Sequence, residues 1–294
     1  MKQNMIYALG FFDGVHRGHQ ALLEECDRLA RQHNCGRAAI TFDAHPQSLF
    51  TQMPPMLINS VSDREMLLKE YHIDHVRILP VTPAVMSQPW QLFLEELVCD
   101  GAAGFVCGDD FRFGHQGQGD AEKIRTFCGE KSLPCVIVPE QSLDGVRISS
   151  TYIRQLIEQG DMENAHRFLG HPHRLSGTVI AGRHLGRTIG VPTANILIPP
   201  GVVVPALGVY ACRCRVDGAY HIAVTNIGSR PTVEGHQVRA ESWILDFDGD
   251  LYGKELTLEF YKFLRPERKF PSLEELRSEI QKNAAETRKY FRNL

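Results

Sequence analysis

Residues 10–19 read GFFDGVHRGH, a glycine-rich stretch between a short apolar run at 5–9 and a helical pattern at 19–33. A buried strand that passes through a tight turn into a helix is typical of a parallel sheet covered by helices on both faces. Ligands of such sheets bind beyond the carboxyl ends of the strands, where glycines let backbone amides approach a phosphate. The stretch therefore predicts a phosphate-binding loop at the start of a nucleotide-binding domain.

Two histidines complete this stretch. His16 and His19 are three positions apart at the start of the predicted helix, so both imidazoles lie on one side of it. There they can donate hydrogen bonds to phosphate oxygens and to the charge that develops during group transfer. A tight turn with two exposed histidines is an alternative interpretation of the same residues. Asp13 equally fits a turn residue or a helix cap. The loop residues that we expect beside the nucleotide are Gly10, Phe11, Asp13 and Gly14.

The first half of the chain alternates strand and helix signals. Apolar runs predict strands at 5–9, 37–42, 75–81, 104–108 and 134–139. Amphipathic patterns predict helices near 19–33, 62–71, 89–98 and 121–130, and two more within 149–170 that are divided at Gly160 and Asp161. This alternation predicts an α/β domain with a parallel sheet over residues 1–170.

After residue 170 the pattern changes. Strand-like runs separated by glycine or Asp-Gly turns lie at 177–182, 208–218, 220–228, 240–250 and 254–264. Several short strands at this spacing predict a closed antiparallel barrel or a sandwich over residues 171–294. We expect a linker at 170–177 before the barrel and an amphipathic helix at 272–291 after it.

Bulk composition narrows the class of protein. The 294 residues are 43% hydrophobic with a net charge of −3, which is enough apolar material for two packed domains and too little positive charge for a nucleic-acid surface. No apolar run approaches the roughly 20 residues that span a bilayer, and the N-terminus does not read as a secretory signal. Eight cysteines without a CxxC pair predict reduced core thiols rather than zinc ligands. We therefore expect a cytoplasmic protein that binds neither nucleic acid nor membrane.

A second stretch, RISSTYIR at 147–154, places three hydroxyls at a helix start between two arginines. Hydroxyls, free amides and guanidinium groups suit a polyphosphate. The candidate phosphate ligands are Arg147, Ser149, Ser150, Thr151 and Arg154. Taken alone, the stretch is explained at least as well by a serine cap beside a surface arginine. Together with the histidine pair, it favours a nucleotide site.

A third candidate site lies in GRHLGRTIGVPTANI, residues 182–196. Gly182, Arg187 and Gly190 belong to a glycine-rich loop. Thr193 and Asn195 follow two positions apart and point to the same face of an extended backbone. A hydroxyl and an amide oxygen there can hold Mg²⁺, which also binds phosphates. A plain hairpin loop followed by a strand is the simpler interpretation.

Glu241 opens the strand that leads into DFDGDLYG, residues 246–253. A carboxylate close to a metal-bound triphosphate can take a proton from an alcohol. A solvent-facing glutamate before an Asp-Gly turn fits the pattern as well, and periodicity does not separate the two.

HxGH near the N-terminus with a distal SSTxxR resembles the nucleotidyltransferase superfamily, whose members transfer a nucleotidyl group and release pyrophosphate. The segments FDGVHRGH, TFDAHP, GDDFRFG, ISSTYIR, GRTIGVPTAN, NIGSRPT and LDFDGDLYG occur in this order along nearly the whole chain. In this combination the chain resembles the bacterial bifunctional riboflavin kinase/FAD synthetase family, because two unrelated motif sets appear in that family's order and spacing.

The resemblance implies a Rossmann-like FMN adenylyltransferase domain at 1–170, which would transfer AMP from ATP to FMN. His16 and His19 would bind and neutralise the ATP phosphates, and the hydroxyls and Arg154 of the second stretch would hold the triphosphate from the other side. The residues implied to line the nucleotide and flavin cleft are Gly108, Asp109 and Asp110.

The resemblance also implies a six-stranded riboflavin kinase barrel at 171–294, which would phosphorylate riboflavin with ATP. Thr193 and Asn195 would hold Mg²⁺ with ATP, and Glu241 would activate the ribityl 5′-hydroxyl. The other residues implied to contact ATP or flavin are Gly182, Arg187, Gly190, Pro192, Asn226 and Arg265.

Riboflavin, FMN and ATP are then the expected partners, FMN and FAD the products, and a monomer or weak homo-oligomer the expected assembly. One alternative is a nucleotidyltransferase for another phosphorylated cofactor precursor, such as phosphopantetheine, against which the PTAN segment speaks. The other is a flavin-binding protein without catalysis. Thr193, Asn195 and Glu241 speak against it, by residue type alone.

Overall fold

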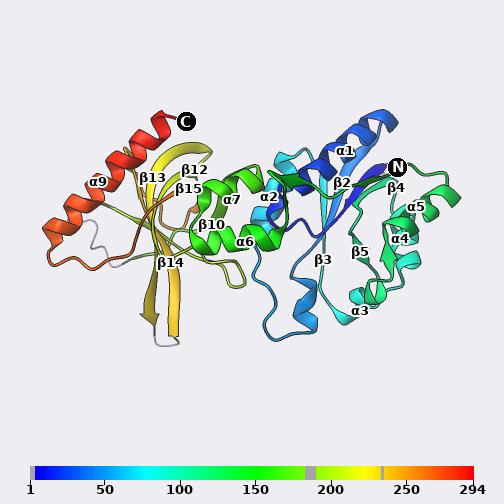
Figure 1. Cartoon of the computed structure of the whole chain (residues 1–294), viewed down its shortest axis with the longest axis horizontal. Helices are drawn as coiled ribbons and strands as arrows, with labels where there is room; N and C mark the ends of the chain where they lie inside the picture. The colour runs from blue at the N-terminus through cyan, green and yellow to red at the C-terminus, as the bar shows by residue number, and fades with distance from the viewer. Residues whose placement is uncertain (1–3, 183–189, 233–234) are drawn as a thin grey trace. The chain divides into compact units, whose positions relative to one another are not determined.

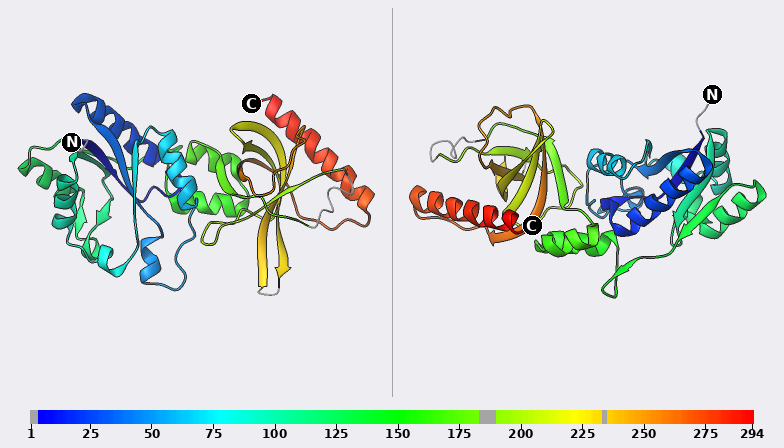
Figure 2. Two further views of the ribbon diagram at one scale, coloured as in Figure 1. Left: turned by 180° about the vertical axis from the view of Figure 1, so that it is seen from behind. Right: turned by 90° about the horizontal axis from the view of Figure 1, so that it is seen from above.

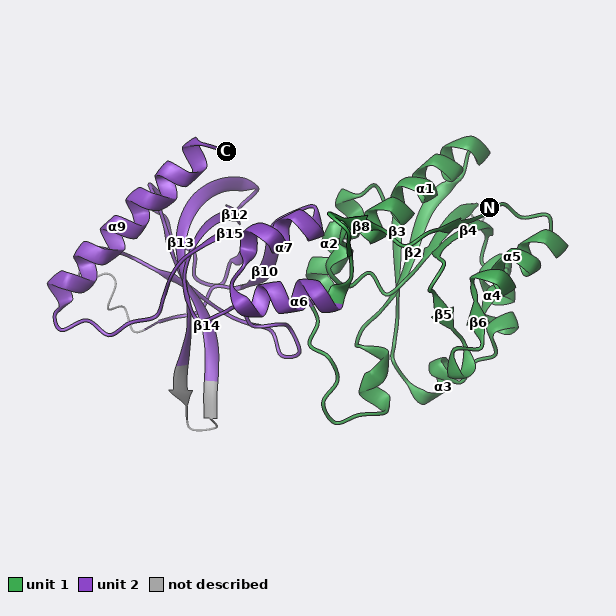
Figure 3. Cartoon of the chain, viewed as in Figure 1, with its two compact units in different colours: residues 1–57, 61–150 green, residues 58–60, 151–294 purple. Residues whose placement is uncertain are grey.

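The computed structural model of the chain describes residues 4–182, 190–232 and 235–294. By its internal contacts the chain divides into two compact units (Figure 3). The first unit comprises residues 1–57 and 61–150, and the second comprises residues 58–60 and 151–294.

The first unit is built on a parallel sheet of five strands in the order β3-β2-β1-β4-β7 (Figure 1). Its strands are β1 (Met5–Leu9), β2 (Gly36–Phe42), β3 (His75–Leu79), β4 (Ala102–Gly108) and β7 (Cys135–Val138). Its helices are α1 (Arg17–His33), α2 (Val61–Glu70), α3 (Pro83–Met86), α4 (Trp90–Cys99) and α5 (Ala121–Glu130). The predicted parallel sheet is confirmed.

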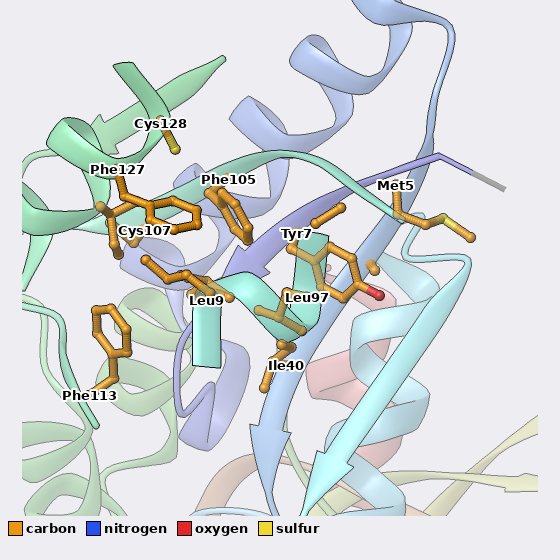
Figure 4. Packing of buried hydrophobic residues seen from close by; sticks show 14 of the residues in the cluster. Met5, Tyr7, Leu9, Ile40, Leu97, Phe105, Cys107, Phe113, Phe127 and Cys128 are labelled. Carbon is orange, nitrogen blue, oxygen red and sulfur yellow. The ribbon is translucent and has the colours of Figure 1, made fainter. Parts of the chain in front are cut away.

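β1 lies at the centre of this sheet, and its side chains alternate between two cores. Tyr7 and Leu9 pack with Leu97 of α4 and Phe127 of α5 (Figure 4). Ile6 faces the other way and packs with residues of α1 and α2. Burial on both faces explains why the run carries no polar position. The turns that follow β1 and its neighbour β4 both leave the carboxyl edge of the sheet.

Two short hairpins and three 3-10 turns complete the first unit. The hairpins pair β5 (Arg112–Phe113) with β6 (Gly119–Asp120), and β8 (Ser142–Leu143) with β9 (Val146–Arg147). The turns are η1 (Asp13–Val15), η2 (Pro46–Leu49) and η3 (His115–Gly117). The sequence did not predict these hairpins, because two-residue strands are too short to show periodicity.

The second unit contains a six-stranded antiparallel sheet in the order β10-β15-β12-β13-β14-β11. The strands are β10 (His173–Thr178), β11 (Ala194–Leu197), β12 (Gly208–Val216), β13 (Ala219–Thr232), β14 (Gly235–Ile244) and β15 (Glu255–Pro266). They curl around a common centre (Figure 2). The two outer strands approach each other, since a Cβ built on Gly177 of β10 would lie 3.4 Å from that of Ile196 on β11. The predicted barrel is therefore confirmed as nearly closed.

The described residues of the second unit form the helices α6 (Ser150–Gln159), α7 (Met162–Leu169) and α9 (Leu273–Arg292), with the first residue of α6 at the unit boundary. Ala284 of α9 packs on one face of the sheet with Val209 and Val224. Gly160, at φ 79°, separates α6 from α7 and lies against the side chain of Tyr210. The functional boundary predicted at residue 170 stays a prediction, because compactness assigns no activity.

The linker predicted at 170–177 is wrong, because β10 begins at His173. Two polar residues open this strand and hide its pattern, yet both are buried. Arg174 is paired inside the unit with Glu259 of β15 at 3.1 Å. A buried ion pair between residues so far apart in the sequence cannot be recognised from local polarity.

The cysteines are free thiols, but they do not all lie in a core. Cys26, Cys107 and Cys214 are buried, and burial raises the pKa of each to about 12. Cys99 is exposed, which corrects the prediction of a core thiol there, whereas Cys35 and Cys135 are half-buried and pack against the two cores of the first unit. Within the described residues, no group of three or more His, Cys, Asp or Glu side chains is placed to hold a metal ion. None of the helices there has the length and apolarity that crossing a membrane requires.

His173 on β10 makes the stability of the barrel sensitive to acid. The side chain is completely buried, and neither ring nitrogen has a hydrogen-bond partner among the described residues. Burial, with a smaller contribution from His171, lowers the pKa of His173 from 6.5 to about 3. Below pH 6.5 the unfolded chain therefore binds a proton that the folded chain does not. We expect the free energy of unfolding to fall between pH 6.5 and pH 3 by up to about 1.4 kcal/mol per pH unit.

Urea unfolding measures this pH dependence. In a Trp90→Phe chain the remaining tryptophan, Trp243, reports on the barrel. His173→Leu should flatten the dependence of the unfolding free energy on pH by about one proton. An unchanged slope in that variant would show that other groups carry the acid sensitivity.

Candidate functional site

Side chains that donate hydrogen bonds to backbone carbonyls hold the turn after β1. Phe12 has φ 56°, a left-handed conformation that is costly for a residue with a side chain. The carbonyl oxygen of Val15 accepts from Nε2 of Gln20 at 2.8 Å. The carbonyl oxygen of Asp13 accepts from Oγ of Ser150 at 2.9 Å. This last bond joins the first predicted stretch to the second, although 137 residues separate them.

His16 and His19 stack on each other at the start of α1. Their ring centroids lie 3.7 Å apart, with an interplanar angle of 13°. His16 is the N-cap of α1, and its Nδ1 accepts from the backbone N–H of His19 at 3.3 Å. An Nδ1 that accepts a hydrogen bond leaves the proton of a neutral imidazole on Nε2. Burial, then His16 and Arg64, lower the pKa of His19 well below its ordinary value. His19 therefore faces the site as a neutral imidazole, so the pair does not act as two cations.

A cavity of about 220 Å³, here called the histidine cavity, gathers most of the predicted phosphate ligands. It lies at the carboxyl edge of the sheet, since residues that follow β4 and β7 also line it. The predicted residues that line it are His16, His19, Gly108, Asp109, Asp110, Arg147, Ser149 and Ser150. The structure thus brings together the histidine pair, the GDD segment and the first half of RISSTYIR.

Arg147 is held at this cavity by two carboxylates. Its Nη2 donates to Oδ2 of Asp110 at 2.8 Å and also contacts Glu140. All three side chains are about half exposed, and exposed ion pairs of this kind are weak. A polyphosphate can therefore displace the carboxylates from Arg147. Sequence reasoning missed Glu140, which carries no motif.

A second cavity of about 320 Å³, here called the apolar cavity, shares His19, Gly108 and Asp110 with the histidine cavity. Gly10 and Phe11, predicted beside the nucleotide, line this cavity instead. Its other walls are mostly apolar: Leu9, Ile40, Phe42, Leu79, Phe93, Phe111 and Phe113. Such a lining suits a large planar ring better than a triphosphate. The two phenylalanines of GDDFRFG were missed as wall residues, although their alternation in the sequence was visible.

Four predicted nucleotide ligands line neither cavity. Asp13 is buried, and Gly14 adopts φ 82° inside the turn η1. Thr151 and Arg154 lie on α6 in the second unit, where Nη2 of Arg154 donates to Oγ1 of Thr151 at 3.1 Å. Asp13 and Gly14 thus shape the turn.

A row of candidate residues crosses the sheet of the second unit. Asn195 of β11 pairs with Glu241 of β14, which pairs with Asn226 of β13. The row continues through Val209 of β12 to Arg265 of β15. Directly opposed residues on antiparallel strands share one face. The proposed metal ligand, base and flavin contacts therefore lie on a single face of the sheet.

Thr193 precedes β11 and is hydrogen-bonded to the row at Asn195. Nδ2 of Asn195 donates to the carbonyl oxygen of Thr193 at 3.3 Å. A Cβ built on Gly182 would lie 2.6 Å from the same Nδ2, so a larger residue at 182 would displace the amide of Asn195. Pro192 and Thr193 also line a cavity of about 320 Å³, together with the Asp-Gly turn that follows β14. Gly190 has φ 72° and follows the segment containing Arg187, which lies outside the described residues.

The two predicted flavin contacts are tied to acidic residues near the C-terminus. Nδ2 of Asn226 donates to Oε1 of Glu267 at 3.2 Å. Nε of Arg265 donates to Oδ1 of Asn283 at 3.1 Å and lies 3.4 Å from Oε1 of Glu279, both on α9. Burial lowers the pKa of Arg265, and Glu279 opposes that shift. Sequence reasoning missed these partners, because the approach of α9 is a tertiary contact.

Known proteins resemble this chain in both its N-terminal and its C-terminal part. Residues 1–152 match the FAD synthetase family model, and residues 169–291 match the riboflavin kinase family model. A bifunctional riboflavin kinase/FMN adenylyltransferase of Listeria monocytogenes is 35% identical over 99% of this chain and 94% of its own. The proteins of the same name from Bacillus subtilis and Escherichia coli are 32% and 34% identical, over 98% and 99% of this chain and 93% and 94% of theirs.

The fold also occurs among solved structures. A Streptococcus pneumoniae protein described as a macrolide-efflux protein superposes with a TM-score of 0.86 at 29% identity. The similarity covers 98% of this chain and 95% of that one.

Proposed function

The chain belongs to the bifunctional riboflavin kinase/FMN adenylyltransferase family, and we propose which of its residues carry each of the two activities. As a riboflavin kinase it converts riboflavin and ATP into FMN and ADP. As an FMN adenylyltransferase it converts FMN and ATP into FAD and pyrophosphate. We assign the second activity to residues 1–170 and the first to residues 171–294, which agrees with the ranges of the two family models.

The adenylyltransferase assignment rests on one observation: the histidine cavity adjoins the apolar cavity, and His19 lines both. The ATP phosphates occupy the histidine cavity, where His16 and His19 donate hydrogen bonds and Arg147 supplies positive charge, while Ser150 holds the turn through its bond to Asp13. The isoalloxazine ring of FMN occupies the apolar cavity. An oxygen of the FMN phosphate then attacks the α-phosphorus of ATP, and pyrophosphate leaves. Such displacements depend on positioning and charge stabilisation, so no covalent nucleophile is required.

The kinase assignment rests on the row that crosses the second unit. Glu241 accepts the proton of the ribityl 5′-hydroxyl as that oxygen attacks the γ-phosphorus of ATP. Asn226 and Arg265 hold the flavin on the same face of the sheet. The assembly that we propose is a cytoplasmic monomer or weak homo-oligomer.

Thr193 and Asn195 are suited to hold Mg²⁺. Both offer neutral oxygens, which this hard cation prefers. The amide nitrogen of Asn195 is engaged by the carbonyl of Thr193, which leaves the amide oxygen to bind the cation. Bound there, Mg²⁺ would neutralise charge on the transferred phosphoryl group.

Removal of the cation should stop FMN formation. Excess EDTA is expected to lower the rate of riboflavin phosphorylation at least about 100-fold, and added Mg²⁺ should restore it. Asn195→Leu should raise the Mg²⁺ concentration needed for half-maximal rate, whereas Asn195→Asp, which keeps an oxygen ligand, should not. Equal Mg²⁺ requirements in the Leu variant and the unsubstituted chain would contradict the assignment.

One incubation tests the pair of activities. The protein is mixed with riboflavin, Mg²⁺ and ATP, and the flavins are resolved by chromatography. Both FMN and FAD are expected. Recovery of riboflavin alone, beside an active control enzyme, would contradict the bifunctional assignment.

A further inference from the structure

Arg64 of α2 is among the largest of the fully buried side chains in the described residues. It belongs to none of the motifs found in the sequence. Its Nη1 donates to the carbonyl oxygen of Phe11 at 3.1 Å and to Oγ1 of Thr41 at 2.9 Å. Thr41 in turn donates to the same carbonyl at 2.6 Å. The guanidinium carbon also lies 4.9 Å from the centroid of the Phe11 ring. One buried cation therefore holds both the backbone and the ring of Phe11.

Phe11 is a wall of the apolar cavity, so whatever fixes it shapes the binding site. The next residue, Phe12, has the costly left-handed conformation, and its ring lies 5.2 Å from that of His19. A strained turn persists only where its surroundings hold it. Arg64 and Thr41 supply that support at the carbonyl of Phe11, and Ser150 supplies it at the carbonyl of Asp13.

Stability alone does not explain a charge at this position. Nε and Nη2 of Arg64 are buried without hydrogen-bond partners among the described residues. Burial lowers the pKa of Arg64, and Asp13 and Asp43 oppose that shift. An apolar side chain of similar volume would pack here without the cost of desolvating a cation. A charged side chain with two nitrogens unpaired in the described part of the chain is therefore better explained by its contacts with Phe11 and Thr41 at the cavity wall than by packing.

We propose that Arg64 is a positioning residue for adenylyl transfer to FMN, fixing Phe11 at the wall of the apolar cavity and placing a positive charge behind His19. The inference rests on the proposed function of these two cavities. Arg64 is one of the groups that lower the pKa of His19, after burial and His16. The other charged residues that line the two cavities are Asp109, Asp110, Arg112, Glu140 and Arg147.

Two substitutions of Arg64 separate geometry from charge. Arg64→Met is expected to raise KM for FMN about tenfold and to move the acid limb of kcat/KM for adenylylation upward by about half a pH unit. Arg64→Lys keeps the charge but not the planar fork, so KM should rise while the pH profile stays. Arg28→Met is the matched control, because Arg28 is exposed on α1 and paired with Glu25. Riboflavin phosphorylation by the same preparations should stay within about twofold in every variant.

An unchanged KM for FMN and an unchanged pH profile in Arg64→Met would overturn the proposal. A mere loss of folded protein would lower the rate but leave both quantities as they were. If Arg64→Met does not fold, Arg64→Lys and Thr41→Val decide, and a KM for FMN unchanged in both would refute the positioning role. Failure of the proposed function itself is recognised separately, because FAD formation would then survive His16→Ala with His19→Ala.

Discussion

Glu241→Gln is expected to lower kcat for FMN formation from riboflavin about 1000-fold, whereas FAD formation from added FMN persists. Glu241 lies between Asn195 and Asn226 on neighbouring strands, beside the proposed metal ligand and flavin contact. Glutamine keeps the shape and the hydrogen bonds of the side chain but cannot take the ribityl proton at neutral pH. Riboflavin should therefore bind and fail to react. Chromatography of two incubations, one begun with riboflavin and one with FMN, separates the activities.

The control for this variant is Glu255→Gln. Glu255 is an exposed carboxylate of β15 that accepts a hydrogen bond from Thr178, and it lies outside the row. Its substitution should leave both activities as they were. FMN formation within tenfold of normal in Glu241→Gln would exclude Glu241 as the base. Loss of both activities would indicate misfolding or coupling between the two sites.

His16→Ala combined with His19→Ala should reverse the pattern, so that FMN accumulates while its adenylylation falls about 1000-fold or more. The stacked imidazoles line the histidine cavity and are the hydrogen-bond donors that we propose for the phosphates. Because they act on one phosphate chain, we expect the double variant to lose less than the product of the single losses. The ratio of FMN to FAD during turnover of riboflavin gives the result directly.

Capping must be separated from catalysis in that experiment. His16 is the N-cap of α1, and alanine at an N-cap costs about 1 kcal/mol of stability. His16→Asn with His19→Asn retains a capping oxygen, so its loss of activity would reflect the missing imidazoles. His33→Ala, in the exposed last turn of α1, is the matched control. Normal FAD output from the alanine double variant would mean that GFFDGVHRGH is only a turn.

The parts of the fold that could be predicted are those in which the buried positions carry apolar side chains. β1 is buried on both faces and reads as an unbroken apolar run, so the parallel sheet could be predicted. β10 could not, because Arg174 is buried against Glu259 and His173 is buried without charge. The polar residues there suggest an exposed segment, although it is buried, because the partner of Arg174 comes from another strand.

The candidate sites divide in the same way. The spacing of His16 and His19 within one helical turn places them together by local geometry, as does that of Thr193 and Asn195 along an extended chain. The pairing of Asn195 with Glu241 depends on strand register, which no local pattern specifies.

The sequence by itself was enough to predict a parallel α/β part and a β-barrel part from hydrophobic patterns, and its short motifs supplied most residues of the two proposed sites, because motifs fix residue types at short range. Only the tertiary structure decided that Phe11 faces an apolar cavity, that Arg147 is held by Asp110, and that Arg64 lies buried beneath the turn. The reason is physical. These contacts join segments whose separation along the chain carries no signal, and they exist only once the sheet has brought the ends of its strands to one edge.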